Sequence, residues 1–294
     1  MLLPQFQYFA PETLDEAFSL LQEFGEEARV LAGGTDLLVK MKQRAIEPLP
    51  KCIINIKKIP GLQYLQTDGK SGLRLGTLTK IQEVKSFLPI RQRFPGLAQA
   101  AGILSTPQVR NIATIGGNLC NASPAAETAP ALNTLSAKVK ILGKDQERIV
   151  PLEEFFLGPG KSVLRSDEIL TEIQVPDPPP NSTSVYVKHG KRLSDIAIVG
   201  VAIAIRMDGN KCSDVKIALA SVGPTPMRAK KAEALMIGEE IGEKLIEEVS
   251  KTVSEESRPI DDMRAYADYR REKVGLLTKE AIKQALQQIK LGGS

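Results

Sequence analysis

The chain has 294 residues, more than one small hydrophobic core requires, so we expect two or three compact units. Hydrophobic residues make up 42% and charged residues 25%, which is typical of a soluble globular protein. The net charge of +4 comes from 39 basic and 35 acidic side chains without a basic stripe, which argues against a nucleic-acid-binding protein.

The N-terminal part alternates helix and strand signals. Thr13 and Glu16 form a capping-box pair ahead of an apolar period that ends at Gly25, which predicts a helix. A glycine pair, Gly33-Gly34, then separates a short strand from a second helix. The further elements predicted here are a strand at 29–31, a helix at 36–44 and a buried strand at 52–56.

The central part mixes strands with short helices and runs of small residues. Thr79 is expected to open a helix with Gln82 as its capping partner. The run PDPPPN at 176–181 contains three consecutive prolines, which can continue neither a sheet nor a helix, so we place a domain boundary there. The predicted strands are 73–76, 138–142, 149–150 and 168–175, and the small-residue segments are 95–102 and 123–137.

The last part opens with two long apolar runs, 196–207 and 212–222. They are joined at Asp208-Gly209-Asn210, and an Asp-Gly turn between apolar runs is a strong hairpin signal. Helical patterns fill the remainder at 227–237, 241–254 and 276–291. The whole pattern predicts an α+β protein built in three pieces.

Targeting signals and thiol chemistry limit the possible functions further. The N-terminus has no basic segment ahead of an apolar stretch, so we expect no signal peptide, and no apolar run is long enough for a membrane span. Cys52, Cys120 and Cys212 stand far apart, which favours a reducing, cytoplasmic setting and excludes an iron–sulfur cluster on this chain. The single histidine, His189, is interpreted as a surface or loop side chain, and we expect no metal site.

Two glycine pairs carry the candidate chemistry. LAGGTDLL at 31–38 is a strand, two glycines, a hydroxyl and a helix start, and TIGGNLCNASPAAET at 114–128 combines two glycines with small residues. Adjacent glycines let the backbone bring its N–H groups close to a ligand, and a helix N-terminus behind them favours phosphate. Thr35 and Asn118 could add side-chain hydrogen bonds. The pattern favours a dinucleotide or another phosphate-bearing ligand held between the two segments.

These loops have alternative interpretations. A single strand–glycine–helix turn can be just a tight connection, an alternative that two such loops weaken. The chain has no G-x-G-x-x-G, so a Rossmann site is not predicted. GPGKS at 158–162 matches the second half of a P-loop, but Phe155 occupies the place of its first glycine, which excludes that nucleotide-binding motif.

The two loops resemble those of the flavoprotein medium subunit of the xanthine dehydrogenase and aerobic CO dehydrogenase family, the molybdenum hydroxylases. The resemblance covers nearly the whole chain and adds five motifs in order. They are FQYFAPETLDEA, LRLGTLT, STPQVRNIATIGGN, YVKHGKRLSDIAIVGVA and SVGPTPMRAKKAE.

This resemblance implies a fold of the vanillyl-alcohol-oxidase (PCMH) type for FAD binding. Two FAD-binding lobes would occupy 1–57 and 58–176, and a smaller C-terminal α/β domain of the CO dehydrogenase flavoprotein type would occupy 177–294. The FAD is expected to be noncovalent, because His189 lies outside the usual attachment segments. The extra cluster of some family members is not expected, because the chain lacks the extra cysteines.

The resemblance also implies a set of cofactor-binding residues. The first loop would wrap the FAD pyrophosphate, and Glu127 would bond ribityl or ribose hydroxyls. Lys188 would lie near the isoalloxazine ring, where a cation could stabilise a reduced flavin; a solvated lysine is the alternative. The implied set is Ala32, Gly33, Gly34, Thr35, Asp36, Leu37, Thr114, Gly116, Gly117, Asn118, Asn121, Glu127, Leu164, Tyr186 and Lys188.

The function implied is that of an electron-transfer subunit without catalytic residues of its own. Molybdenum cofactor and iron–sulfur clusters would be on partners, a molybdopterin-binding large subunit and an iron–sulfur small subunit. Electrons would pass through FAD to an external acceptor, which could be NAD, a quinone, ferredoxin or oxygen. The alternatives are a self-contained flavin oxidase of the same superfamily and a scaffold that has lost its cofactor.

Overall fold

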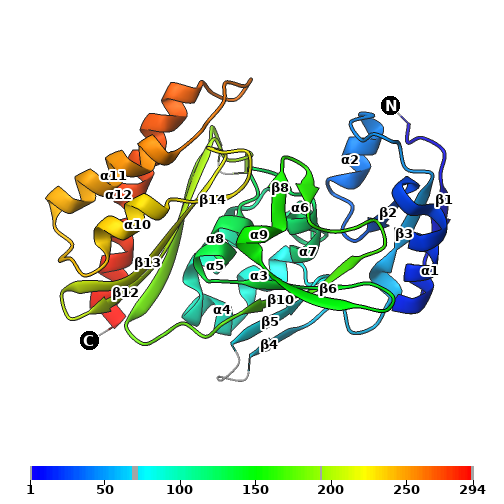
Figure 1. Cartoon of the computed structure of the whole chain (residues 1–294), viewed down its shortest axis with the longest axis horizontal. Helices are drawn as coiled ribbons and strands as arrows, with labels where there is room; N and C mark the ends of the chain where they lie inside the picture. Colours follow the sequence, from blue (N-terminus) through cyan, green and yellow to red (C-terminus); the bar gives the residue numbers. More distant parts are fainter. Residues whose placement is uncertain (1, 68–71, 193, 293–294) are drawn as a thin grey trace.

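The computed structural model describes residues 2–67, 72–192 and 194–292. The chain runs along the long axis of the molecule, with its N-terminal part at one end and its C-terminal part at the other (Figure 1). Separate sheets, each with its own helices, succeed one another along this axis, so the α+β prediction is confirmed.

The N-terminal sheet is parallel and packs between two helices. Its elements are β1 (Gln7–Phe9), α1 (Leu14–Phe24), η1 (Gly25–Glu27), β2 (Ala28–Leu31), α2 (Leu37–Lys42), β3 (Cys52–Asn55) and η2 (Ile56–Lys58), with strand order β1-β3-β2. Ile54 of β3 packs with Leu21 of α1, whereas Ile53 packs with Met41 of α2. Because successive strand residues point to opposite faces, the unbroken apolar run of β3 is what a strand covered on both sides requires.

Helix α1 begins and ends as the sequence predicts. The Thr13 hydroxyl accepts the N–H of Glu16 at 3.2 Å, which satisfies one of the free donors of the first turn. Gly25 follows the last turn with φ +50°, and its N–H bonds the carbonyl of Leu21. A residue with positive φ at this point favours glycine, which explains where the helix stops.

The central sheet is antiparallel and carries several short helices on one side (Figure 1). Its strand order is β4-β5-β10-β6-β7, and a small hairpin, β8 with β9, stands apart. The elements are β4 (Leu65–Thr67), β5 (Leu73–Gly76), α3 (Ile81–Ser86), α4 (Leu88–Arg93), α5 (Pro95–Ile103), α6 (Pro107–Arg110), α7 (Ile115–Cys120), α8 (Thr128–Thr134), β6 (Lys138–Leu142), β7 (Glu147–Pro151), α9 (Leu152–Phe155), β8 (Phe156–Gly158), β9 (Lys161–Ser162) and β10 (Ile169–Val175).

The predicted start of α3 is wrong by two residues. Thr79 does not cap the helix, because its hydroxyl donates to the carbonyl of Tyr64 at 2.7 Å. Lys80 takes the cap position instead, and its N–H donates to the carboxylate of Glu83 at 2.8 Å, so Gln82 has no capping role. Thr79 is fully buried, and a tertiary hydrogen bond there outweighs the local capping preference.

The C-terminal sheet is antiparallel, in the order β11-β12-β13-β14. Its part of the chain comprises β11 (Ser182–His189), β12 (Val199–Asp208), β13 (Lys211–Ala220), β14 (Met227–Arg228), α10 (Lys230–Met236), α11 (Glu243–Glu256) and α12 (Ala267–Gly292). The predicted hairpin is confirmed: Asp208 pairs with Lys211 across a turn in which Gly209 has φ +56°. The last helix begins earlier than predicted, and the helix expected from residue 227 is preceded by a short strand.

The strands of this sheet have two buried faces of different character. On β12, Val201, Ile203 and Ile205 pack against the C-terminal helices. Ala202 and its neighbour across the sheet, Ala218, point the opposite way, into the core of the central part. Helices α5 and α8 pack on this small-residue face, as α11 and α12 are layered on the other side (Figure 1). The sheet is therefore shared between two cores.

Hydrogen bonds fix α5 along β11. The Gly96 N–H donates to the Ser184 hydroxyl at 3.0 Å, and the Tyr186 N–H donates to the Gln99 side chain at 2.7 Å. A side chain at Gly96 would place its Cβ 3.0 Å from the backbone nitrogen of Val185. Helix positions three to four apart thus meet strand positions two apart, which locks the register of the two elements.

We call the contact of α5 and α8 with the small-residue face of the C-terminal sheet the seam. Its close packing predicts that substitutions on the two faces of β12 differ in their cost to stability. Ala202→Leu should lower the free energy of unfolding by about 1–3 kcal/mol, because the added atoms have no space against α5 and α8. Ile203→Leu, one residue away on the opposite face, keeps the side-chain volume and should cost less than about 1.5 kcal/mol. Urea unfolding followed by circular dichroism measures both; equal losses would contradict the tight seam.

Candidate functional site

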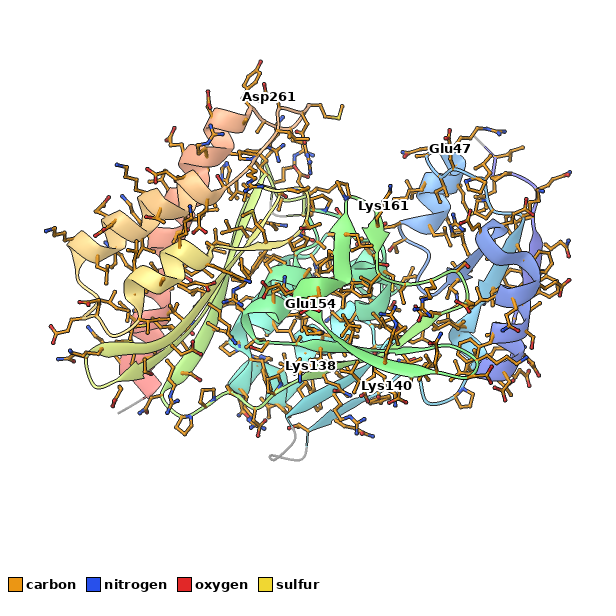
Figure 2. The ribbon with its side chains drawn as sticks, in the orientation of Figure 1. Glu47, Lys138, Lys140, Glu154, Lys161 and Asp261 are labelled. Atoms are coloured by element: carbon orange, nitrogen blue, oxygen red, sulfur yellow. The ribbon has the colours of Figure 1, made fainter. Side chains whose placement is uncertain are left out.

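A cleft of about 790 Å³ opens where the N-terminal, central and C-terminal parts meet. Every residue of the predicted cofactor set except Tyr186 and Lys188 lines it. Glu47 and Lys161 also line the cleft, and Figure 2 shows them on the N-terminal part and on the β8–β9 hairpin, respectively. The structure therefore brings together two loops that are about 80 residues apart in the sequence.

The first loop follows β2 and presents unpaired backbone donors. No acceptor among residues 2–67, 72–192 and 194–292 bonds the N–H groups of Gly33, Gly34, Thr35 or Asp36. Gly34 has φ +75°, a conformation that glycine adopts without strain. Successive free N–H groups in such a turn form a concave anion-binding nest. This loop can hold a phosphate group.

The second loop differs from the prediction, because its N–H groups are already bonded. The Gly117 N–H donates to the Thr114 hydroxyl at 3.1 Å, and the Gly116 N–H donates to the carbonyl of Thr77 at 3.0 Å. Ile115 and Asn118 likewise donate to backbone carbonyls. The N–H groups of residues 115–118 are therefore not free for a ligand, because α7 is capped by its own threonine and by the segment between β5 and α3. The loop instead lines the cleft with small residues.

Gly33 and Gly116 permit close approach of backbone segments. A Cβ on Gly33 would lie 2.5 Å from the carbonyl oxygen of Ile112, so the first loop rests directly on the segment before α7. A Cβ on Gly116 would lie 1.8 Å from the Thr77 hydroxyl. A Cβ on Gly117 would meet the Thr114 hydroxyl at 2.9 Å and the Ala32 Cβ at 3.9 Å. The first two glycines are needed by the fold, whereas the third faces the cleft.

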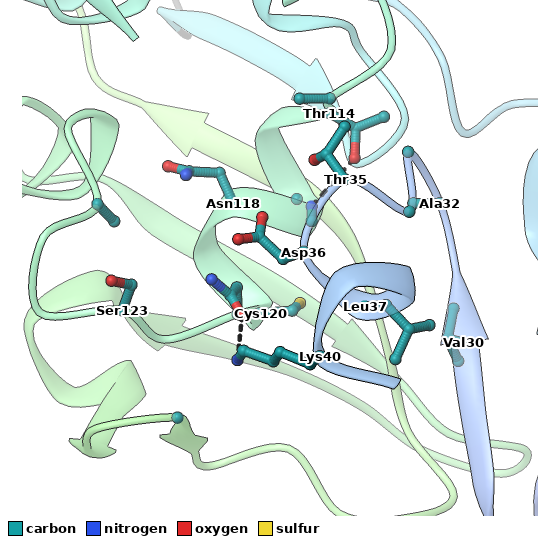
Figure 3. A pocket seen from close by; sticks show the side chains of 18 of the residues that line it. Val30, Ala32, Thr35, Asp36, Leu37, Lys40, Thr114, Asn118, Cys120 and Ser123 are labelled. Carbon is teal, nitrogen blue, oxygen red and sulfur yellow. Dashed lines mark hydrogen bonds between the residues drawn. The ribbon is translucent and has the colours of Figure 1, made fainter. Parts of the chain in front are cut away.

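Polar side chains line the cleft on both sides (Figure 3). The Asn118 oxygen accepts from the Thr128 hydroxyl at 2.5 Å, which leaves its amide nitrogen for a ligand. The Lys40 ammonium donates to Asn121 at 2.5 Å, the dashed line in Figure 3, and so joins α2 to the end of α7. This bond links the N-terminal part to the central part at the edge of the cleft.

Two of the carboxyl groups that line the cleft, and its thiol, have shifted pKa values. Partial removal from water raises the pKa of Asp36, and the nearby Lys40 opposes the shift. Burial also raises the pKa of Glu127, against the attraction of Lys188. Burial raises the pKa of the Cys120 thiol to about 12, so it stays protonated at neutral pH and supplies no thiolate nucleophile.

Tyr186 and Lys188 do not line the cleft. Both project from β11 toward the central part, and the Lys188 side chain is only 2% exposed. The Lys188 ammonium donates to Glu127, which does line the cleft, at 3.3 Å. The alternative of a solvated lysine is therefore wrong. The Lys188 ammonium bonds Glu127 but does not itself line the cleft.

Several lining residues were not predicted from the sequence. Lys40 lies one helical turn after Asp36, so i,i+4 spacing could have indicated it. Ser194 and Ile196 come from the loop between β11 and β12, and no local pattern signals their place in the cleft. Further unpredicted lining residues with polar side chains are Arg29, Glu47, Thr77, Ser105, Ser123, Lys161 and Glu168.

Metal binding requires several ligating side chains close together, and the described residues include His, Cys, Asp and Glu. Among them no group of three or more His, Cys, Asp or Glu side chains is placed to hold a metal ion. In the same part of the chain, no helix is long and apolar enough to cross a membrane.

Comparisons with known proteins agree with this geometry. Residues 4–178 match the family model described as the FAD binding domain in molybdopterin dehydrogenase. Residues 184–285 match the CO dehydrogenase flavoprotein C-terminal domain.

Similar proteins cover almost the whole chain. It is 33% identical over 286 residues to the carbon monoxide dehydrogenase medium chain of Hydrogenophaga pseudoflava, covering 97% of this chain and 98% of that one. It is 34% identical over 284 residues to the glyceraldehyde dehydrogenase medium chain of Sulfolobus acidocaldarius, covering 97% and 99%. A solved structure of the Hydrogenophaga pseudoflava carbon monoxide dehydrogenase, in a form lacking the Mo-pyranopterin moiety, superposes with a TM-score of 0.94 over 98% of this chain and 99% of that one, at 33% identity.

The two adjacent glycines of the second loop should respond differently to the same small change. Gly116→Ala should lower the free energy of unfolding by about 1–3 kcal/mol, because its Cβ collides with Thr77. Gly117→Ala should cost about 1 kcal/mol at most, the worth of the Thr114 cap that it disturbs. Denaturant titration of the two variants measures the difference, and a larger loss for Gly117→Ala would contradict this description of α7.

Proposed function

We propose that this chain, which belongs to the family of FAD-binding domains in molybdopterin dehydrogenases, holds noncovalent FAD in its cleft and passes electrons through it. It is a flavoprotein component of an oxidoreductase complex of the molybdenum hydroxylase type, as its relatives are. Electrons would enter from iron–sulfur clusters of a partner subunit and leave to an external acceptor.

The observation that carries this proposal is the nest of free N–H groups at 33–36. A phosphate group there would receive hydrogen bonds from backbone donors that have no other described partner. Gly33 and Gly34 keep side chains away from this position. The cleft volume of about 790 Å³ lies within the usual range for sites of small molecules and cofactors. The residues present therefore fit FAD.

We assign the following roles to the chain's own residues. The backbone from Ala32 to Asp36 would hold the pyrophosphate. The wall formed by Thr114, Gly117 and Asn118 would hold the adjacent sugar, with the Asn118 amide nitrogen as a donor. Glu127 would accept from ribityl or ribose hydroxyls, since a carboxylate accepts hydrogen bonds and repels phosphate. Further lining groups in the proposed site are Gly34, Thr35, Leu37, Gly116, Asn121 and Leu164.

Bound FAD would supply electron-transfer chemistry, taking electrons singly and releasing them in pairs. The chain's task is then binding, exclusion of water and adjustment of the local charge. Lys40 and Lys161 contribute positive charge at the cleft edge, which complements the phosphates. No acid–base step is assigned to any residue of this chain.

The partners follow from the same proposal. Relatives named as medium chains support an assembly with an iron–sulfur small subunit and a molybdopterin-binding large subunit, which would hold the other cofactors. The three free cysteines agree with a reducing, cytoplasmic location. The acceptor would reach the FAD from outside the chain, and no residue is assigned to it.

Gly117→Val tests the cofactor site. Its methyl groups would extend from the wall of α7 into the cleft, so the variant should fold but lose FAD binding by at least about tenfold in Kd, or about 1.4 kcal/mol. Quenching of flavin fluorescence on titration with the protein measures Kd, and circular dichroism checks the fold.

Gly242→Val is the matched control. Gly242 precedes α11, and a Cβ there meets no atom within 4 Å. This variant should bind FAD as the unchanged chain does. Normal FAD affinity in a folded Gly117→Val chain would argue strongly against the second loop as part of the site.

Substrate reduction separates the electron-transfer role from a self-contained oxidase. The isolated, FAD-loaded chain should keep its absorption near about 450 nm when carbon monoxide or glyceraldehyde is added without oxygen. The same chain purified in a complex with its partners should lose that absorption when the correct substrate is added. Bleaching of the isolated chain by a substrate would favour the oxidase.

A further inference from the structure

We infer that Lys188 is a positioning residue of the C-terminal sheet, which holds the Glu127 carboxylate in place at the wall of the cofactor cleft. The inference rests on the proposed function, because Glu127 is taken to contact FAD. It assigns the C-terminal part a role in cofactor affinity that is transmitted through a single buried ion pair.

The Lys188 ammonium has its hydrogen-bonding capacity filled. It donates to the carbonyl of Ile103 at 2.8 Å, the carbonyl of Asp195 at 3.0 Å and Oε1 of Glu127 at 3.3 Å. An ammonium has three N–H donors, so these acceptors use all of them. The acceptors come from three separate segments: the end of α5, the loop before β12 and the start of α8. One side chain thus ties these segments together behind the cleft.

Besides its own backbone N–H, the Glu127 carboxylate has Lys188 as its one hydrogen-bond donor in the described part of the chain. Glu127 occupies the residue before α8, yet its side chain makes no capping hydrogen bond to the helix. Its side chain is 9% exposed and lines the cleft, and no other residue in the described part of the chain donates to Oε2. A carboxylate in such a place needs a partner to remain charged and oriented. Lys188 is that partner.

The position of Lys188 is itself fixed by the seam between the two parts. Ser184, Tyr186 and Lys188 lie at alternate positions on β11 and face α5. Their contacts with Gly96, Gln99 and Ile103 follow one face of that helix. The Lys188 ammonium thus reaches Glu127 from a strand that is hydrogen-bonded to α5. Ser194 and Ile196 of the C-terminal part line the same cleft. The packing of the C-terminal sheet on the central part therefore also shapes the cleft wall.

Few charged groups act on the Glu127 carboxylate. Asp36 is the other carboxylate acting on Glu127, and it lies on the opposite loop. Tyr186 lies on the Lys188 side of the seam, with its hydroxyl buried and without a partner among the described residues. Neither supplies a positive charge, so Lys188 is the cation paired with Glu127 within the described chain.

A double-mutant cycle on the full-length chain tests the inference, with Kd for FAD as the readout. Lys188→Met should raise Kd about tenfold when Glu127 is present, because the carboxylate loses its partner. In the E127Q background the same change should alter Kd by less than about twofold, since no carboxylate is left to position. Lys188→Gln, whose amide can still donate to the two carbonyls, should follow the same pattern.

Ser184→Ala is the control for the seam. It removes the Gly96–Ser184 hydrogen bond on the same face of β11 without touching Glu127, so Kd for FAD should stay within about twofold of the unchanged chain. Thermal unfolding of all variants records any general loss of stability.

The outcomes separate the two proposals. An equal rise in Kd for Lys188→Met with and without Glu127 would show a purely structural role and overturn the inference, while leaving FAD binding intact. Failure of both Lys188 variants to fold in either background would overturn it in the same way. An unchanged, folded chain that takes up no FAD would overturn the proposed function and this inference together.

Discussion

The cofactor cleft exists because two backbone segments touch at Gly33. The absence of a side chain there lets the loop after β2 rest on the carbonyl of Ile112, just before α7. This contact sets the N-terminal part against the central part, and the bond between Lys40 and Asn121 closes the same junction from the other side. The free N–H groups of the first loop then face a space bounded by the second loop. A larger residue at position 33 would separate the two parts before it disturbed any ligand.

The two glycine loops have different tasks despite their similar sequences. In the first loop, which lines the cleft, the N–H groups have no acceptor among the described residues, which suits a phosphate. In the second, Thr114 and Thr77 bond those groups, and the glycines serve packing and clearance. The difference arises from the neighbours: carbonyls of Thr77 and Thr79, between β5 and α3, accept from the N–H groups of the second loop, whereas no described residue accepts from those of the first.

The C-terminal sheet connects stability to the cleft. One face of β12 carries large apolar residues for its own helices, and the other carries small residues that let α5 and α8 approach. That close approach lets Lys188 reach Glu127 across the seam. A lysine with an apolar strand around it looks solvent-exposed in sequence, yet here its charge is enclosed and fully hydrogen-bonded. Buried charges of this kind persist only where partners are fixed, and the seam fixes them.

The sequence by itself determined the α+β class, the hairpin at Gly209, the start of α1 at Thr13 and the two glycine loops, because each depends on neighbours along the chain. Family motifs added FAD and thirteen of the residues that line the cleft. Only the tertiary structure decided that Thr79 bonds Tyr64 instead of capping a helix, and that the N–H groups of residues 115–118 are already bonded. It alone placed Lys188 behind Glu127, because contacts between residues 61 positions apart are set by how the sheets pack and leave no local pattern.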